Sequence, residues 1–195
     1  FENINELNPI NDPNNEKNND KNKRKVDLIL DCTDNLETRF LLNDFSIKKS
    51  IPFIYSSAVG SKGYIFNIIP NKTPCIRCFL KESAQLDTCE TTGVMNTITH
   101  LISSIQVNEA IKIILKKDTE KSLLFFDIWG NELVKINVNR NKNCVCCANH
   151  NFEYLDGKQS SRIVKLCGNN IYQIKTKIMD ENQFNEIKTK FKKIG

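Results

Sequence analysis

Hydrophobic positions along this chain follow two different spacings, and the order of the segments predicts the fold class. Short apolar runs indicate buried strands, whereas apolar residues repeated every three or four positions indicate helices. Short runs predict strands over residues 26–32, 52–56, 63–69, 123–129 and 133–138. Helical spacing predicts helices over residues 36–49 and 93–117. The order strand, helix, strand, strand, helix, strand, strand indicates an α/β fold with a mixed sheet.

The pattern also divides the chain into three parts. Residues 26–150 carry the predicted strands and helices of the main body, with Trp129 as an aromatic residue of a strand. Residues 1–25 are an Asn/Lys-rich, low-complexity lead-in, which lacks the apolar residues needed to offset the entropy cost of ordering. Residues 151–195 are predicted to form a small C-terminal α+β extension, with short strands near 162–165 and 170–175 and a helix from Asp180.

Composition excludes several classes of protein. The 195 residues carry 28 Lys and Arg against 23 Asp and Glu, and this net charge of +5 is too small and scattered to indicate a nucleic-acid partner. Mean hydropathy is −0.41, and no apolar run approaches the roughly 20 residues that span a bilayer. The first residues have neither the basic segment nor the apolar core of a signal peptide.

Eight cysteines are the most unusual feature of the composition, and four of them form two CxxC pairs. Without a secretory segment, paired cysteines favour metal binding in a reducing compartment, the cytoplasm, over four disulfides. The pairs are Cys75 with Cys78 and Cys144 with Cys147. Four thiolates complete a tetrahedral zinc site, so this zinc would be structural. A redox CxxC and two accidental pairs remain as alternatives.

The spacing of the two pairs predicts how this zinc would be used. About 65 residues separate Cys78 from Cys144, so the metal would clasp two distant loops and would not form a compact zinc ribbon. Cys146 is too near Cys144 to complete such a pair, and we expect it to be dispensable as a ligand.

Two further residues are candidates for chemistry. Asp34 follows a buried strand, where open α/β sheets place their ligands, and its carboxylate can hold Mg²⁺ against phosphate or cap the next helix. Cys89 precedes the second helix, where a thiol ionises more readily, although Asp87 and Glu90 oppose this. Taken alone, a single cysteine in a loop is more often inert than catalytic.

Several motifs together resemble the ThiF/MoeB/HesA family, relatives of the ubiquitin-activating enzymes. LDCTDN at residues 30–35, followed by Arg39 and Asn43, resembles the signature of that family. The other matching stretches are PCIRC at 74–78, CETTGV at 89–94, EAIK at 109–112, FDIW at 126–129, NCVCC at 143–147, YLDG at 154–157 and LCGNN at 166–170.

The resemblance implies a Rossmann-like fold and an adenylation reaction. Such enzymes bind ATP and Mg²⁺ and adenylate the C-terminal Gly-Gly of a sulfur-carrier or ubiquitin-like β-grasp protein. Asp34 matches the family's Mg²⁺/ATP aspartate, Asn35 its nucleotide-contacting neighbour, and Cys89 the cysteine that forms a thioester or acyl-persulfide link. The resemblance also implies a homodimer and a sulfur donor protein as partners.

One departure from the family bears on activity. The family's glycine-rich nucleotide loop lies upstream of the region that matches Val26, and residues 1–25 contain no glycine. We therefore expect this chain to correspond to the later part of an adenylation domain and to be inactive alone. The alternative function is a non-catalytic, zinc-stabilised module that binds a β-grasp protein.

Overall fold

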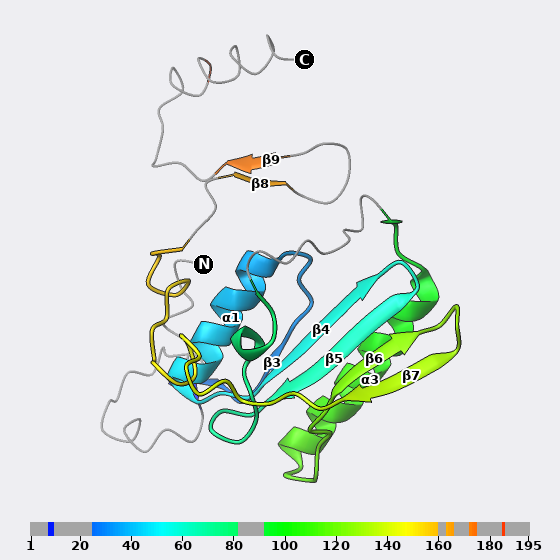
Figure 1. Cartoon of the computed structure of the whole chain (residues 1–195), viewed down its shortest axis with the longest axis horizontal. Helices are drawn as coiled ribbons and strands as arrows, with labels where there is room; N and C mark the ends of the chain where they lie inside the picture. Colours follow the sequence, from blue (N-terminus) through cyan, green and yellow to red (C-terminus); the bar gives the residue numbers. More distant parts are fainter. Residues whose placement is uncertain are drawn as a thin grey trace. The chain divides into compact units, whose positions relative to one another are not determined.

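A five-stranded mixed sheet forms the body of the protein (Figure 1). The computed structural model describes residues 8–9, 25–81, 92–159, 163–165, 172–174 and 185. Contacts divide the chain into two units, Phe1–Gln159 and Ser160–Gly195. The sheet lies in the first unit. The functional boundaries at residues 25 and 150 stay a prediction.

The sheet contains one parallel and three antiparallel strand pairs. Its order is β3 (Ile29–Leu30), β4 (Phe53–Val59), β5 (Lys62–Ile68), β6 (Leu123–Asp127) and β7 (Glu132–Ile136). β3 and β4 are parallel, and the remaining neighbours are antiparallel. The carboxyl ends of β3, β4 and β6 therefore lie at one end of the sheet, together with the start of β5 and β7.

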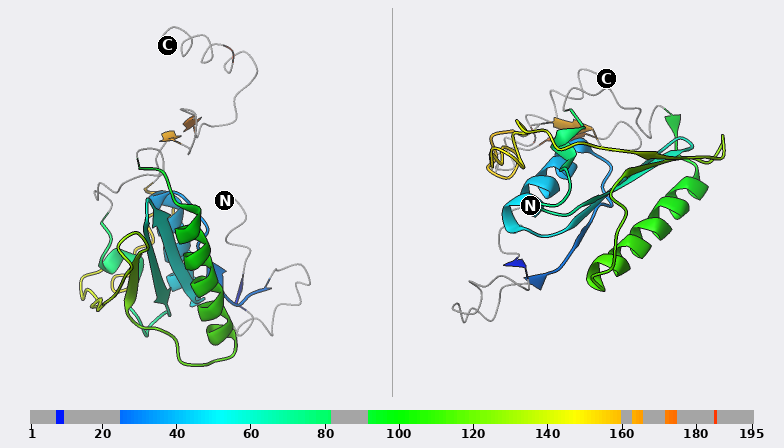
Figure 2. Two further views of the ribbon diagram at one scale, coloured as in Figure 1. Left: turned by 90° about the vertical axis from the view of Figure 1, so that its right-hand side faces the viewer. Right: turned by 60° about the horizontal axis from the view of Figure 1, so that its bottom comes forward.

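Two helices cover opposite faces of the sheet, as the two views of Figure 2 show. Helix α1 (Leu36–Lys49) places Phe40 against Phe53, Tyr55, Phe66 and Ile68 in one core. Helix α3 (Asn96–Ile114) places Ile98 and Ile102 against Ile54 and Ile65 in the other. The alternation of strand side chains between the two cores follows from the pleat.

Close packing of α3 on the sheet depends on Gly63. A Cβ built at this residue would lie 2.5 Å from a side-chain carbon of Ile102, closer than carbon atoms pack. Glycine at this position therefore lets the helix rest directly on the backbone of β5. This contact contributes to the fixed position of the α3 side chains that reach the end of β3.

The strands and helices predicted for the main body are confirmed, with three informative differences, whereas the helix predicted from Asp180 lies almost wholly outside the residues that the structure describes. The strand expected over 26–32 divides into β2 (Lys25–Val26) and β3, because β2 pairs with β1 (Asn8–Pro9) and β3 pairs with β4. β4 continues to Val59 because β5 pairs with it along its whole length. β6 ends at Asp127, whose carboxylate accepts bonds from the amides of Trp129 and Gly130.

The prediction that Trp129 is part of a strand is therefore wrong. The Asp127 turn places it between β6 and β7, where its side chain is 79% exposed. In the second unit, β8 (Ile163–Lys165) and β9 (Tyr172–Ile174) form an antiparallel pair, in agreement with the strands predicted there. None of the helices in the described residues is long and apolar enough to span a membrane.

Candidate active site and metal centre

The turn that follows β3 is organised around a buried carboxylate. Asp31 is fully buried, and its Oδ1 accepts bonds from the amide of Thr33 at 2.9 Å and from the hydroxyl of Thr33 at 2.7 Å. Its Oδ2 accepts from Nε of Arg39 at 3.0 Å. A buried carboxylate is stable only when its oxygens are paired in this way. Asp31 therefore fixes the path of the chain just before Asp34.

Arg39 connects this turn to the neighbouring strand. Its Nη2 donates to the carbonyl of Thr33 at 2.7 Å and to the carbonyl of Ser56 at 3.2 Å, while Nε binds Asp31. The guanidinium also lies 5.5 Å from the centre of the Tyr55 ring. A planar group with several donors can make all of these contacts at once.

Side chains from β4 and α3 hold the carbonyl of Asp31 from the other side. The hydroxyl of Ser56 donates to it at 2.8 Å, and Nε2 of Gln106 donates to it at 2.9 Å. Gln106 also donates to the carbonyl of Ile54 at 3.2 Å, and its side chain is buried. Residues from three elements thus position one turn, which makes the turn rigid.

The structure separates the roles of Asp34 and Asn35. Oδ1 of Asn35 accepts a bond from the amide of Thr38 at 2.8 Å, so Asn35 is the N-cap of α1. Asp34 is exposed, and its Oδ1 accepts a bond from Nδ2 of Asn35 at 3.2 Å. Of the two roles considered for Asp34, helix capping therefore belongs to Asn35. An exposed carboxylate at the start of a helix, beside a donor amide, suits a Mg²⁺-bound phosphate.

We expect Arg39→Lys to loosen this turn. A lysine keeps the charge but cannot replace the three directed bonds of the guanidinium, so at least one buried carbonyl would lose its donor. The free energy of unfolding should fall by about 1–3 kcal/mol. Urea denaturation measures it. The exposed Lys48→Ala serves as control, with a change within about 0.5 kcal/mol. Equal stability of both variants would contradict the role given to Arg39.

At the same end of the sheet, backbone hydrogen bonds connect the end of β4 to the segment before α3. Gly60, at the end of β4, adopts a φ of 61° and bonds to the segment before α3 through its amide and its carbonyl. The partners are the carbonyl of Gly93 and the amide of Met95. The segment that follows Cys89 in the chain therefore joins the sheet at the end of β4, beyond the part of β4 that pairs with β3. Cys89 itself lies outside the described residues.

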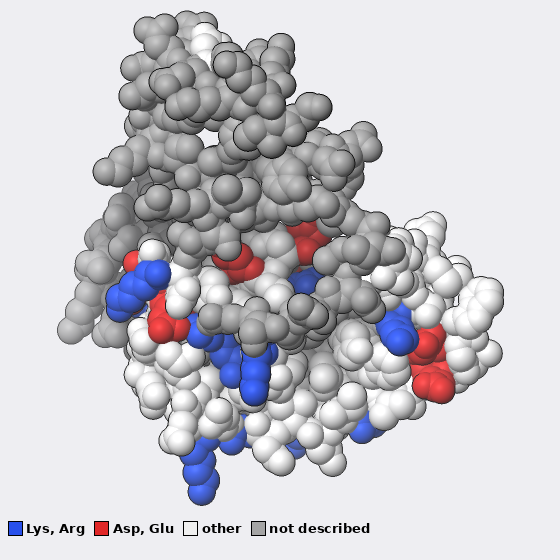
Figure 3. All heavy atoms as spheres, turned by 45° about the horizontal axis from the view of Figure 1, so that its top comes forward, with Lys and Arg blue, Asp and Glu red and all other residues white. Residues whose placement is uncertain are grey.

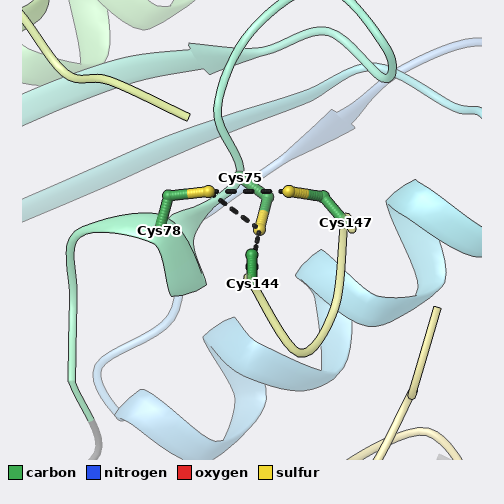
Figure 4. A group of neighbouring side chains, drawn as sticks. All are labelled: Cys75, Cys78, Cys144 and Cys147. Atoms are coloured by element: carbon green, nitrogen blue, oxygen red, sulfur yellow. Dashed lines mark hydrogen bonds between the residues drawn. The ribbon is translucent and has the colours of Figure 1, made fainter. Parts of the chain in front are cut away.

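The two CxxC pairs come together as predicted, and Figure 4 shows their four sulfur atoms turned toward one another. The ligand atoms of Cys75, Cys78, Cys144 and Cys147 all lie within 4.8 Å of one another. Sγ of Cys75 is 3.5 Å from that of Cys144, and Sγ of Cys78 is 3.5 Å from that of Cys147. Tetrahedral zinc with bonds of about 2.3 Å requires sulfur separations of about 3.8 Å, so the cluster fits this ion.

Hydrogen bonds within the cluster shift the pKa values of its thiols in opposite directions. The bond with Cys144 raises the pKa of Cys75 and of Cys78, while bonds from these two thiols lower the pKa of Cys144. Thiolates are the metal-binding form of cysteine, so a divalent cation that binds here would displace the protons of the four thiols. All six cysteines of the described residues are free thiols, so disulfides do not account for the pairing there.

Sequence reasoning correctly grouped the four cysteines but missed the residues that support the cluster and the turn after β3. It noted Arg39 and Asn43 only as part of a signature, and it did not single out Asp31 or Gln106. The available signal was an aspartate at the end of an apolar strand, which must find buried partners. Glycine and cysteine spacing alone carry no information about such partners.

Comparisons with known proteins agree with this geometry. The model of the ThiF family matches residues 2–147. The sulfur carrier protein ThiS adenylyltransferase of Bacillus subtilis is 31% identical over 176 residues, which cover 88% of this chain and 52% of that protein. The SAMP-activating enzyme E1 of Haloferax volcanii is 30% identical over 126 residues, covering 62% of this chain and 46% of that enzyme. The chain thus spans about half the length of these relatives.

Solved structures show the same fold. The crystal structure of E. coli MccB with ATP superimposes with a TM-score of 0.53 at 15% identity, over 63% of this chain and 40% of that one. The structure of E. coli MccB alone gives the same TM-score and identity. The mixed α/β sheet, the rigid turn at residues 31–35 and the family match over three quarters of the sequence lead to one conclusion. The chain belongs to the ThiF family.

Proposed function

We propose that the complete protein uses ATP and Mg²⁺ to adenylate the C-terminal glycine of a sulfur-carrier or ubiquitin-like β-grasp protein. The observation that carries this proposal is the rigid turn that presents Asp34 at the carboxyl end of β3. Ligands of open α/β sheets bind at this end. The names of the relatives from B. subtilis and H. volcanii support a carrier protein as the substrate.

In this reaction a carboxylate oxygen of the carrier attacks the α-phosphorus of ATP. A new P–O bond forms, the bond to pyrophosphate breaks, and the pyrophosphate leaves with its electron pair. Two anions must approach each other, and Mg²⁺ supplies the charge that makes this approach favourable. Asp34 would hold the metal, and Asn35, fixed as the helix cap, would orient Asp34 and contact the nucleotide.

ATP–pyrophosphate exchange with the full-length protein tests this function. Exchange that depends on a carrier ending in Gly-Gly is the expected result. Carrier binding without exchange would favour the alternative, a zinc-stabilised binding module. No exchange and no binding with any such carrier would contradict both functions.

We propose that the four-cysteine cluster binds one structural Zn²⁺. Four thiolates would fill the tetrahedral site and leave no open position for a substrate, so the metal would hold the two loops together and take no part in the reaction. Cys146 is buried nearby but lies outside this ligand group.

We further propose that the thiolate of Cys89 attacks the carbonyl of the adenylated carrier, so that a C–S bond forms, the bond to AMP breaks and AMP leaves, which gives a thioester. If a sulfur donor protein has first transferred a persulfide sulfur to Cys89, the same attack gives an acyl-persulfide. Cys89→Ala in the complete enzyme should leave pyrophosphate exchange largely intact, because no thiol takes part in adenylation. The thiol-sensitive carrier adduct, seen on gels without reductant, should disappear. Stability should change by no more than about 0.5 kcal/mol.

Cys32 provides a matched control, because it is an exposed free thiol in the turn that carries Asp34. Cys32→Ala should retain the adduct. An adduct that survives Cys89→Ala would remove Cys89 from the mechanism and leave a protein that only adenylates its carrier.

The charged and apolar side chains on the surface bear on two further kinds of partner, nucleic acid and a second copy of the chain. On the face in Figure 3, Lys and Arg side chains of the described residues lie near Asp and Glu side chains, and with the small net charge of +5 we propose no nucleic-acid partner. Exposed apolar residues on α3 and β7, among them Ile111, Ile114 and Leu133, support a homodimer, which light scattering would detect. The two CxxC pairs favour a metal site over disulfides, and we propose a reducing compartment such as the cytoplasm on that ground.

A further inference from the structure

A buried amide on helix α1 contacts both halves of the cysteine cluster. Asn43 is fully buried, and its Oδ1 accepts a bond from the amide of Ile76 at 3.0 Å. Its Nδ2 donates to Sγ of Cys146 at 3.3 Å. Ile76 lies between the first two ligands, and Cys146 lies between the second two. One side chain therefore spans two loops that are far apart in the sequence.

The surroundings of Cys146 extend this connection. Its buried thiol interacts with the side chains of Cys75, a ligand, and of Asp44, the next residue of α1. Oδ2 of Asp44 accepts a bond from the amide of Tyr154 at 3.0 Å. Helix α1 thus holds the second cysteine loop and the chain that follows it through two consecutive side chains.

We propose that Asn43, acting with Cys146, is the positioning residue of the metal centre. The two side chains hold the CxxC loops at the separation that the ion requires, and neither of them is a ligand. This inference rests on the proposed zinc site. Groups that orient ligands from outside the coordination shell typically change metal affinity by about 10–100-fold when they are lost.

The distinction between positioning and ordinary packing is testable because the chain offers a matched amide. Asn67 is also buried, and its Nδ2 donates to Oε2 of Glu109 at 2.6 Å and to the carbonyl of Glu120 at 3.0 Å. None of these partners is a cysteine. Asn67→Ala therefore removes a buried amide with two bonds while leaving the contacts between α1 and the cysteine loops.

The experiment measures Zn²⁺ affinity of the full-length protein by competition with a chromophoric chelator. Asn43→Ala should bind one Zn²⁺ with affinity lowered about 10–100-fold. Cys146→Ala should act in the same direction, and Cys146→Ser, which keeps a hydrogen-bonding group, should stay close to the original affinity. The double variant Asn43→Ala/Cys146→Ala should lose little more affinity than either single change.

With Co²⁺ as the probe, the thiolate charge-transfer bands should persist in every variant, because the four ligands are unchanged.

Asn67→Ala should lower the melting temperature without changing the Zn²⁺ affinity. If Asn43→Ala binds Zn²⁺ with an affinity within about twofold of the original, this inference is overturned, while the proposed zinc site stands. If Asn43→Ala does not fold, Cys146→Ala against Cys146→Ser gives the same test, and equal affinities of these two variants would overturn it. An original protein that binds no Zn²⁺ would remove the proposed metal site and this inference together.

Discussion

Asp34→Ala in the full-length enzyme should abolish ATP–pyrophosphate exchange, with a loss of at least about 100-fold in rate. The exposed carboxylate of Asp34 is the group in this turn that can hold Mg²⁺ against the phosphates of ATP. Without it, the negative charges of carrier and nucleotide approach each other without compensation. The adduct at Cys89 should disappear as well, because it forms only after adenylation.

The fold should survive this change, since Asn35, and not Asp34, caps α1. Melting temperature and zinc content should therefore equal those of the original protein. Asp118→Ala is the matched control, because Asp118 is an exposed aspartate between α3 and β6, at the opposite end of the sheet. Exchange by Asp34→Ala at the rate of Asp118→Ala would exclude Asp34 from nucleotide binding.

Removal of the metal should have the largest effect on stability. Closing a loop of this length contributes about 4 kcal/mol, which corresponds to a fall in melting temperature of roughly 10 °C for a protein of this size. Calorimetry with and without a strong chelator measures the change, because the energy of metal binding is here energy of folding. Cys144→Ser should show a similar loss without chelator.

Cys32→Ser serves as the control for this experiment, because Cys32 is an exposed cysteine outside the cluster. Its melting temperature should not change, and its response to the chelator should be that of the original protein. Far less than one zinc per folded chain, or a Cys75–Cys78 disulfide in protein prepared under reducing conditions, would contradict the proposed metal site.

Much of the fold could be predicted because its signals are local. Leu36 and Phe40 are four positions apart, as on one face of a helix, and both pack into the same core, and the apolar runs of β4 and β5 are strands. The cysteine cluster could be predicted from chemistry, since two CxxC pairs need each other to complete a tetrahedral site. In both cases the residues whose spacing supports the prediction are the same residues that form the core or the cysteine cluster.

The rest could not be predicted because it depends on distant partners. The break between β2 and β3 arises from a change of neighbouring strand, which apolar spacing does not record. The bonds of Gln106 and Arg39 to backbone carbonyls join residues far apart in sequence, and polar side chains in helices have many other uses. The position of Trp129 depends on a turn made by the carboxylate of Asp127.

The separation of the two cysteine pairs also has a consequence for biosynthesis. Cys75 and Cys144 are 69 positions apart, so a ribosome that adds about 5–20 residues per second needs roughly 3–14 s to pass from one to the other. During that interval the nascent chain offers a two-thiolate site, which binds Zn²⁺ weakly. The full site exists only after α3, β6 and β7 have been synthesised. Zinc would thus stabilise finished chains and leave truncated ones to proteolysis.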